Sequence, residues 1–298
     1  MKKTLSLISA AVMTAGMAFS AAANASELPK DYNPSYYFKA DEGTGIEVLK
    51  YGNVYVNTKK ASADGAVVPC AIYIKDDQKL AGFVGAKWQC DNKSLVLKNL
   101  ESPVKKYEKT PYADFNESED DILRKEFDKL NMLSIVYSTT TSADPMKLSG
   151  ETSDAYPLAC FNAALASDAA LGSYDINIIN EGEYTSTVTP RYEDPSIIGS
   201  VDMSKTSKNL RVNVSDRLLG DINNNGFIDA VDASAILKEY AMISAKKEPS
   251  MTPEQSAAAD INGDKIIDAV DASGVLAYYA SVSSGAKDIT LNQFINKH

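Results

Sequence analysis

Histidine is almost absent from this sequence. The 298 residues include a single histidine, His298, at the end of the chain. Ser-His-Asp catalysis, Cys-His catalysis and His-ligated zinc all require an internal imidazole, so the sequence argues against these chemistries. Catalysis by paired carboxylates is not excluded in this way, because 40 acidic residues leave many possible pairs.

Cysteine is also scarce. The three cysteines are Cys70, Cys90 and Cys160, and each lies in an apolar, strand-like context. Disulfides therefore do not supply the framework of the fold. We expect buried free thiols that behave as small hydrophobic side chains. A Cys70–Cys90 disulfide is the alternative.

The chain has a single long apolar run, close to its start. Two lysines precede the apolar stretch 5–23, and the sequence A-N-A at 23–25 has the small-x-small pattern of a cleavage site. A membrane anchor is disfavoured, because the purely apolar part is short and no second such segment follows. We expect a secretory signal over 1–25 and a secreted, extracellular protein from Ser26.

Positive charge is in short supply. Removal of 1–25 deletes two lysines and no acid, which leaves 28 basic and 40 acidic side chains and a net charge of −12. This excess argues against nucleic acid and anionic membranes as partners, and we expect no membrane insertion. It suits a soluble secreted protein that requires a cation.

The remaining chain has room for two domains, and its first part has the pattern of short strands. Alternating or apolar segments separated by Gly, Pro, Asn and Asp run from 46 to 214, and the strand at 66–74 places Val68, Cys70, Ile72 and Ile74 on one face. The other segments are I-E-V-L-K-Y-G-N-V-Y-V, F-V-G-A-K-W-Q-C, S-L-V-L, M-L-S-I-V-Y, P-L-A-C-F-N-A-A-L, Y-D-I-N-I-I and L-R-V-N-V. Many short strands with turn signals predict a mainly β fold, a β-sandwich or jelly roll over 26–214.

One helix is expected inside this domain. Asn116 is a suitable N-cap, and Ile122, Leu123, Phe127 and Leu130 form an apolar stripe that we expect to pack on a sheet.

The domain boundary has two interpretations. If L-R-V-N-V is the closing strand, residues 215–217 form a short linker and the Pro-containing stretch 183–207 is a long loop inside the sandwich. Alternatively, 183–207 is itself the linker between the domains.

After Val214 the periodicity changes to two copies of an acidic loop followed by a helix. The sequence I-D-A-V-D-A-S occurs at 228–234 and again at 267–273, and T-P-E-Q at 252–255 is a capping box with proline at the first helical position. The copies diverge farther along, where Lys238-Glu239 corresponds to Ala277-Tyr278, a difference that would break the symmetry of the two helices if it lay on their contact faces.

Each acidic loop has the ligand spacing of a twelve-residue calcium loop. Such loops bind Ca²⁺ with oxygens from positions 1, 3, 5, 7, 9 and 12. The first copy offers Asp221, Asn223, Asn225, the Phe227 carbonyl, Asp229 and Asp232, and the second offers Asp260, Asn262, Asp264, the Ile266 carbonyl, Asp268 and Asp271. We therefore expect two calcium ions. At position 8, Ile228 and Ile267 are placed to join the loops back to back.

Both loops depart from the usual pattern. Position 12 is Asp rather than Glu, a shorter side chain that must lie closer to the ion. Position 6 is Gly226 in the first loop but Lys265 in the second, where the sharp turn requires positive φ, so the second site is the less certain one. The alternative interpretation is a pair of acidic helix caps that bind no ion.

The two loops with their exiting helices resemble the duplicated repeat of a dockerin, over about 218–285, with 286–298 as a C-terminal tail. Dockerins are calcium-folded modules that attach proteins to cohesins in cellulosomes. The resemblance implies a small α-helical domain and partner contacts by the residues just after each loop. These are Ala230, Val231 and Ser234 in the first copy and Ala269, Val270 and Ser273 in the second.

The N-terminal domain resembles a cohesin. The residues that carry the resemblance are G-A-V-V-P-C-A-I-Y-I, A-G-F-V-G-A-K-W-Q-C-D and P-L-A-C-F-N-A-A-L-A-S-D-A-A-L-G-S-Y-D-I-N-I. A cohesin followed by a dockerin is similar to the small adaptor scaffoldins of ruminococcal (ScaC-type) cellulosomes. The resemblance implies a non-catalytic adaptor whose dockerin binds the cohesin of a larger scaffoldin and whose cohesin binds dockerin-bearing enzymes, at the cell surface through the cellulosome.

Two other functions compete with the adaptor. A dockerin-borne carbohydrate-binding module would need an exposed aromatic platform, for which Trp88, Tyr36/Tyr37 and Tyr51/Tyr55 are candidates, and a small glycosidase would need two facing carboxylates. An EF-hand calcium sensor is disfavoured by the signal sequence, the Asp at position 12 and the absence of Met-rich helices.

Overall fold

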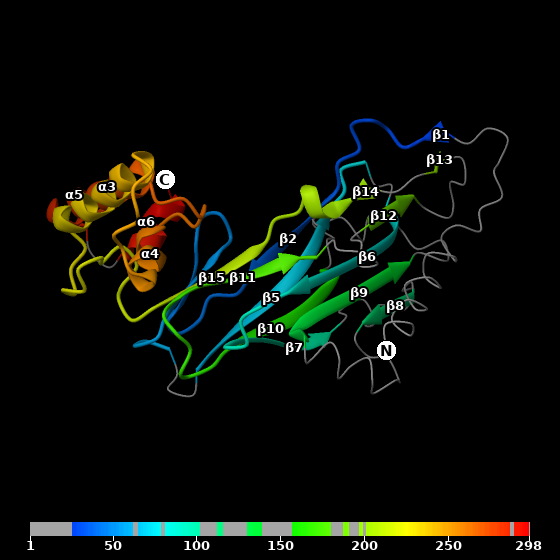
Figure 1. Cartoon of the computed structure of the whole chain (residues 1–298), viewed down its shortest axis with the longest axis horizontal. Helices are drawn as coiled ribbons and strands as arrows, with labels where there is room; N and C mark the ends of the chain where they lie inside the picture. Colours follow the sequence, from blue (N-terminus) through cyan, green and yellow to red (C-terminus); the bar gives the residue numbers. More distant parts are fainter. Residues whose placement is uncertain are drawn as a thin grey trace.

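The computed structural model describes residues 26–61, 65–78, 81–101, 112–115, 130–138, 157–179, 187–190, 197–198, 201–286 and 289–297. These residues form a strand-rich domain followed by a helical domain at one end of it (Figure 1). The expected signal segment 1–25 lies outside the described residues, as does the helix expected after Asn116, apart from its last residue Leu130, which is helical.

The strand-rich domain contains two main sheets that enclose one core. The strands are β1 (Ser26–Glu27), β2 (Ser35–Ala40), β3 (Ile46–Val48), β4 (Val54–Asn57), β5 (Ala66–Lys75), β6 (Ala81–Gln89), β7 (Leu95–Glu101), β8 (Tyr112–Phe115), β9 (Met132–Ser138), β10 (Ala159–Leu165), β11 (Gly172–Ile178), β12 (Thr187–Pro190), β13 (Ile197–Ile198), β14 (Val201–Asp202) and β15 (Leu210–Ser215). One sheet has the order β2-β5-β10-β7, and the other has the order β14-β12-β6-β11-β15-β4-β3, with β9 and β8 continuing from β6. This arrangement is the predicted β-sandwich.

The core between the sheets follows the period-two pattern of the sequence. On β5, Val68, Cys70, Ile72 and Ile74 are all buried, as predicted. Trp88 of β6 is fully buried and packs edge-on against Tyr36 and Phe38 of the facing sheet, with ring centroids 5.2 and 6.1 Å apart. An aromatic cluster therefore joins the two layers.

The structure places more of the chain in the sandwich than the sequence pattern indicated. Strand β2, which precedes the predicted strands, is a member of the four-stranded sheet, with its Tyr36 side chain fully buried. Within 183–207, β12 pairs with β6, and β14 pairs with β12. The interpretation of 183–207 as the interdomain linker is therefore wrong, because this stretch contributes strands to the larger sheet.

The three cysteines are free thiols, so the Cys70–Cys90 disulfide does not form. Cys70 and Cys90 are buried, and Cys160 is half-buried. Burial raises the pKa of the Cys70 thiol to about 12, which keeps it protonated and unreactive. Burial also raises the pKa of Cys90. Both behave as small core residues, as expected.

The helical domain has a second hydrophobic core, which includes Leu49 and Tyr55 of the sandwich, and the chain enters this domain directly after β15 ends at Ser215. Its helices are α3 (Ala230–Ser244), α4 (Pro253–Ala259), α5 (Ala269–Ser283) and α6 (Leu291–Lys297). The Tyr55 hydroxyl donates to the Arg217 carbonyl at 2.8 Å, and the Asn57 amide donates to the same oxygen at 2.7 Å. The short linker is therefore fixed to the sandwich.

The expected tail 286–298 is partly a helix. Leu291 of α6 is buried in the core of the helical domain, beside Leu219 and Val275. The structure thus extends the helical domain to Lys297, because α6 covers apolar surface of the second repeat. Within the described part of the chain, no helix is both long and apolar enough to cross a membrane.

Candidate calcium loops and contact helices

The first loop folds around its own predicted ligands. The two oxygens of Asp221 accept hydrogen bonds from the amides of Asn225 and Gly226 at 3.1 and 2.9 Å. The side chains of Asn223 and Asn225 each accept from the amide two residues later, at 3.0 and 2.8 Å. The side-chain oxygens at positions 1, 3 and 5 therefore all bond backbone amides of their own loop.

The second loop repeats this arrangement. Asp260 accepts from the amides of Gly263 and Lys265 at 2.9 and 3.0 Å. Asn262 and Asp264 each accept from the amide two residues later, at 2.7 and 2.8 Å. The match in sequence is thus a match in local structure.

The Asp at positions 9 and 12 also begins each helix. Asp229 is the N-cap of α3 and accepts from the Val231 amide, while Asp232 accepts from the Asp229 amide at 3.0 Å. Asp268 and Asp271 form the same capping box on α5. The capping interpretation therefore accounts for positions 9 and 12. It leaves positions 1, 3 and 5 unexplained.

Buried negative charge favours a cation at both loops. Asp221, Asp232, Asp260 and Asp271 are all buried. Burial, together with the nearby carboxylates of Asp260 and Asp264, raises the pKa of Asp271 to about 7. Burial also raises the pKa of Asp260 to about 6, with a contribution from Asp264, and it raises the pKa of Asp232. A divalent cation would relieve this repulsion.

The donor chemistry suits calcium rather than a softer metal. The sites combine carboxylates, Asn amides and the Phe227 and Ile266 carbonyls, which are oxygen ligands only. Among the described residues, no three His, Cys, Asp or Glu side chains already converge as a metal cluster. In the loops, Asp232 and Asp271 accept from the Ile222 and Ile261 amides at 2.9 and 3.0 Å. The residues fit a calcium ion.

Position 6 adopts the backbone conformation that the sequence analysis expected. The φ angles of Gly226 and Lys265 are +86° and +74°. Position 4 is also left-handed in both loops, at Asn224 and Gly263. Ile228 and Ile267 at position 8 are both partly buried against the core of the helical domain.

The predicted contact residues lie on the outer surface of α3 and α5. Val231 and Val270 are 60% and 61% exposed, although both are apolar. The set Ala230, Ser234, Ala269 and Ser273 is exposed as well. Each helix thus presents the repeated residues to solvent.

The exposed apolar surface continues beyond the residues that sequence reasoning named. Leu237, Tyr240 and Ile243 on α3 are exposed, and so are Leu276, Tyr279 and Val282 on α5. The two sets are spaced 39 residues apart, as are the repeated heptapeptides. Comparing the sequence with itself at this spacing along the whole of both helices would have identified these residues.

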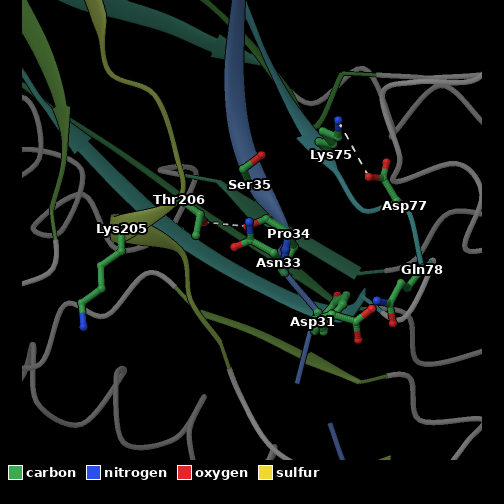
Figure 2. Close-up of a pocket in the computed structure, with 10 residues that line it drawn as sticks. Asp31, Asn33, Pro34, Ser35, Lys75, Asp77, Gln78, Lys205 and Thr206 are labelled. Carbon is green, nitrogen blue, oxygen red and sulfur yellow. Dashed lines mark hydrogen bonds and ion pairs between the residues drawn. The ribbon is translucent and has the colours of Figure 1, made fainter. Parts of the chain in front are cut away.

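A polar hollow of about 460 Å³ lies on the sandwich and contains none of the loop residues. Figure 2 shows its lining, in which Lys75 pairs with Asp77 at 3.8 Å and the Thr206 hydroxyl donates to the Pro34 carbonyl at 2.6 Å. Lys205 and Gln78 also line the hollow. The lining offers no stack of exposed aromatic rings, so it does not resemble a sugar-binding platform.

Comparisons with known proteins agree with the helical repeat. Residues 219–278 match the family described as the dockerin type I domain. A search of curated proteins found no match.

Solved structures similar to the chain include several cohesins. One is the seventh ScaB type I cohesin of Pseudobacteroides cellulosolvens, with 16% identity over 52% of this chain and 86% of that one and a TM-score of 0.35. Another is a type III cohesin from the ScaE cell-surface anchoring scaffoldin of Ruminococcus flavefaciens, with 11% identity over 62% and 89% and a TM-score of 0.39. A cohesin–dockerin complex of Clostridium thermocellum matches at 10% identity over 61% and 99%, with a TM-score of 0.36. Identities and scores this low do not define the family of the strand-rich domain.

Proposed function

We propose that this protein is a non-catalytic adaptor scaffoldin of a cellulosome. Its dockerin, with a calcium ion in each loop, binds the cohesin of a larger scaffoldin. Its N-terminal domain acts as a cohesin and presents itself to the dockerins of enzymes. The protein is secreted and is held at the cell surface through the cellulosome. The match of 219–278 to the dockerin type I domain supports the first of these roles.

The observation that carries the proposal is the duplicated apolar surface of α3 and α5. Four exposed pairs lie 39 residues apart: Val231 and Val270, Leu237 and Leu276, Tyr240 and Tyr279, and Ile243 and Val282. Leaving so many apolar side chains in water is unfavourable, and such a patch on a small domain is typical of a protein interface. Two equivalent surfaces suit a partner that binds either one.

Calcium would hold these surfaces in place. The ligand at position 9 is the N-cap of each contact helix, and the ligand at position 12 lies in its first turn. An ion bound there therefore fixes the start of the helix. The segment 218–285 carries ten acidic and four basic side chains, and without the ion the carboxylates gathered in its two loops would repel one another. The contact surface therefore depends on the ion through the helix N-termini.

The N-terminal domain has one sheet face suited to a second partner. Val67 of β5 and Val96 of β7 are 46% and 42% exposed on the outer face of the four-stranded sheet. On the same face, Tyr37 and Tyr73 stack at 5.3 Å, and the Lys39 ammonium lies 4.6 Å from the Tyr73 ring. We place the surface for enzyme-borne dockerins on this face.

The rival carbohydrate-binding function is weakened by the aromatic residues. Trp88, Tyr36 and Tyr55 are all fully buried, so they cannot stack on a sugar. Tyr51 is exposed but stands apart from the Tyr37–Tyr73 stack, on a turn beside the second loop.

Capture from a lysate tests the proposal. The bait is the chain from Ser26 with charged residues at Val231 and Val270, so that only the N-terminal domain can bind. We expect it to retain dockerin-bearing enzymes and to be washed from insoluble cellulose. Retention on cellulose without enzyme capture, or sugar release from xylan that one Asp or Glu substitution abolishes, would refute the adaptor.

A further inference from the structure

The two calcium loops have different surroundings. In the first loop, the stretch 223–227 is exposed to solvent. In the second loop, Asn262 and Gly263 are buried against the turn 49–53 of the N-terminal domain. Among the described residues, the second loop therefore packs on the sandwich, whereas the stretch 223–227 of the first loop faces solvent.

Hydrogen bonds to backbone carbonyls of the second loop join it to the turn 49–53. The Tyr51 amide donates to the Asn262 carbonyl at 3.1 Å. The side chain of Asn53, which is buried, donates to the Gly263 carbonyl and accepts from the Arg211 amide at 2.8 Å. Asn53 thus connects the loop to strand β15.

Lys265 supplies a charged contact to the same domain. Its ammonium lies 3.4 Å from a carboxylate oxygen of Asp175 on β11 and 3.4 Å from the Asn209 carbonyl. Asp175 is held by Arg211 through two hydrogen bonds of 2.9 Å. At the equivalent position of the first loop, a Cβ atom on Gly226 would meet nothing within 4 Å. The lysine occupies a strained left-handed position and gains a partner there.

Gly263 is the second departure of this loop from its twin. Asn224 occupies the equivalent position of the first loop, and both residues have positive φ. A Cβ atom on Gly263 would lie 2.7 Å from the Cβ of Leu49, which is too close. Leu49 is itself buried among residues of the helical domain. Asn in place of glycine would therefore force Leu49 or the loop to shift.

We infer that the second calcium loop is also the docking element that fixes the helical domain on the N-terminal domain. The loops differ at positions 4, 5, 6 and 7, and the exchanges at positions 4 and 6 both serve this contact. Asp260, at position 1, accepts from the amides of Gly263 and Lys265, the two residues that touch the sandwich. Calcium binding and docking therefore require one loop conformation, and each strengthens the other.

The docking leaves the contact helices free. Helix α4 contacts β15 through the Ser215 hydroxyl, which donates to the Glu254 carbonyl at 3.3 Å, and Asn292 of α6 donates to the Val48 carbonyl at 3.0 Å. Helices α3 and α5 lie on the side away from the sandwich (Figure 1). This inference rests on the calcium binding in the proposed function and not on the identity of any partner.

The test uses the chain from Ser26 with substitutions on the sandwich side, so that no calcium ligand changes. Leu49→Asp removes the buried contact, and Asp175→Asn removes the ion pair without disturbing a core. Tyr51→Asp is the matched control, because the Tyr51 side chain is exposed and only its amide bonds the loop. Nitrogen-15 relaxation gives the rotational correlation time of each domain, and calcium titration is followed at the amides of Gly226 and Lys265.

In calcium, we expect both domains of the wild type and of Tyr51→Asp to share one correlation time. In Leu49→Asp the time for α3 to α6 should fall about twofold, since the helical domain then tumbles on its own. The calcium dissociation constant at the second loop should rise about fivefold or more in Leu49→Asp and in the same direction in Asp175→Asn, with the first loop unchanged.

Independent tumbling of the wild-type domains in calcium would overturn the inference. It would be overturned equally by unchanged second-loop affinity in Asp175→Asn, a variant that stays decisive if Leu49→Asp does not fold. Absence of calcium binding at both loops would overturn it together with the calcium part of the proposed function. Loss of cohesin binding alone would leave it standing.

Discussion

Glu239 and Tyr278 occupy equivalent positions of α3 and α5, and both side chains turn away from the exposed faces of their helices. The buried Glu239 carboxylate accepts from the Ser250 and Met251 amides at 2.8 and 3.2 Å. The Tyr278 hydroxyl donates to the Ile289 carbonyl at 3.1 Å. This pair thus fixes the segments that follow each helix, and the exposed faces of the two helices stay similar, with Lys238 and Ala277 as their clear difference.

From this symmetry we expect either helix to suffice for binding a cohesin. Bulky or charged residues at one set of contact positions should leave the affinity within about threefold of wild type, because the other helix remains intact. The combined set should abolish binding. Calorimetry with three variants measures this: one changed at Ala230, Val231 and Ser234, one at Ala269, Val270 and Ser273, and one at all six. Complete loss in one single set, with calcium-dependent folding retained, would show that one helix carries the contact.

The helical domain should lose most of its helix when calcium is removed. The buried carboxylates of Asp221, Asp232, Asp260 and Asp271 then lack a counter-ion. Far-ultraviolet circular dichroism of the chain from Ser26, in EDTA and in calcium, measures the change. Equal helicity in the two conditions would show that the loops are caps alone.

Within the first loop, Asp232→Ala should weaken calcium binding more than Asp229→Ala. Asp232 is fully buried and accepts from the Ile222, Asn223 and Asp229 amides, whereas position 9 of such loops often acts through water. Asp229→Ala should cost about 1 kcal/mol of stability through the lost N-cap. Calcium titration of both variants gives the order, and the reverse order would contradict the assignment of positions.

Calcium affinity should fall as the pH is lowered from about 8 to about 5. The pKa values of Asp260 and Asp271 in the folded, calcium-free loop are about 6 and about 7, above the ordinary value near 3.9. Protons therefore compete with the ion in this range. In EDTA, the stability of the calcium-free protein should change with pH in the opposite direction and fall as the pH rises. Both carboxyl groups bind protons more tightly in the folded state, and the stability gained from this protonation is lost as the pH rises through 6 to 7. Calorimetric titrations and melting curves across this pH range measure both effects, and a pH-independent affinity would contradict the pKa shifts.

Trp88→Ala should destabilise the sandwich, and we expect it to have no effect on binding to polysaccharide. Trp88 is fully buried against Tyr36 and Phe38, so its loss should cost about 3–5 kcal/mol in the free energy of unfolding. Urea denaturation measures the loss. Tyr51→Ala, at an exposed ring, is the control and should change stability by less than about 0.5 kcal/mol. A stable Trp88→Ala protein that no longer adheres to cellulose would instead support a carbohydrate-binding module.

Local pattern predicted the elements whose ends and faces are determined nearby. The alternation around Cys70 gave the buried face of β5, and T-P-E-Q gave the start of α4, where the Thr252 amide donates to Gln255 at 3.0 Å. The repeated spacing of Asp and Asn gave two loops in which Asp221 and Asp260 accept from amides of their own loops. Each of these depends on contacts between residues close in sequence.

The features that sequence reasoning missed depend on distant contacts. Nothing near Lys265 or Gly263 in the sequence indicates that Asp175 and Leu49 lie opposite them. In the same way, α6 lies in a segment expected to be a tail, and its place is determined by Leu291 packing into the core of the helical domain. Such positions follow from the tertiary fold.

The central claim is that one molecule links a scaffoldin cohesin to an enzyme-borne dockerin. Size-exclusion chromatography with light scattering measures this directly, with the chain from Ser26 mixed in calcium with a cohesin of a larger scaffoldin and a dockerin-bearing enzyme. The account predicts a single 1:1:1 complex that loses the cohesin in the variant changed at both contact helices. If the protein binds the cohesin but no dockerin-bearing enzyme in any combination tested, the adaptor function is contradicted. The N-terminal domain would then be a cargo that the dockerin carries.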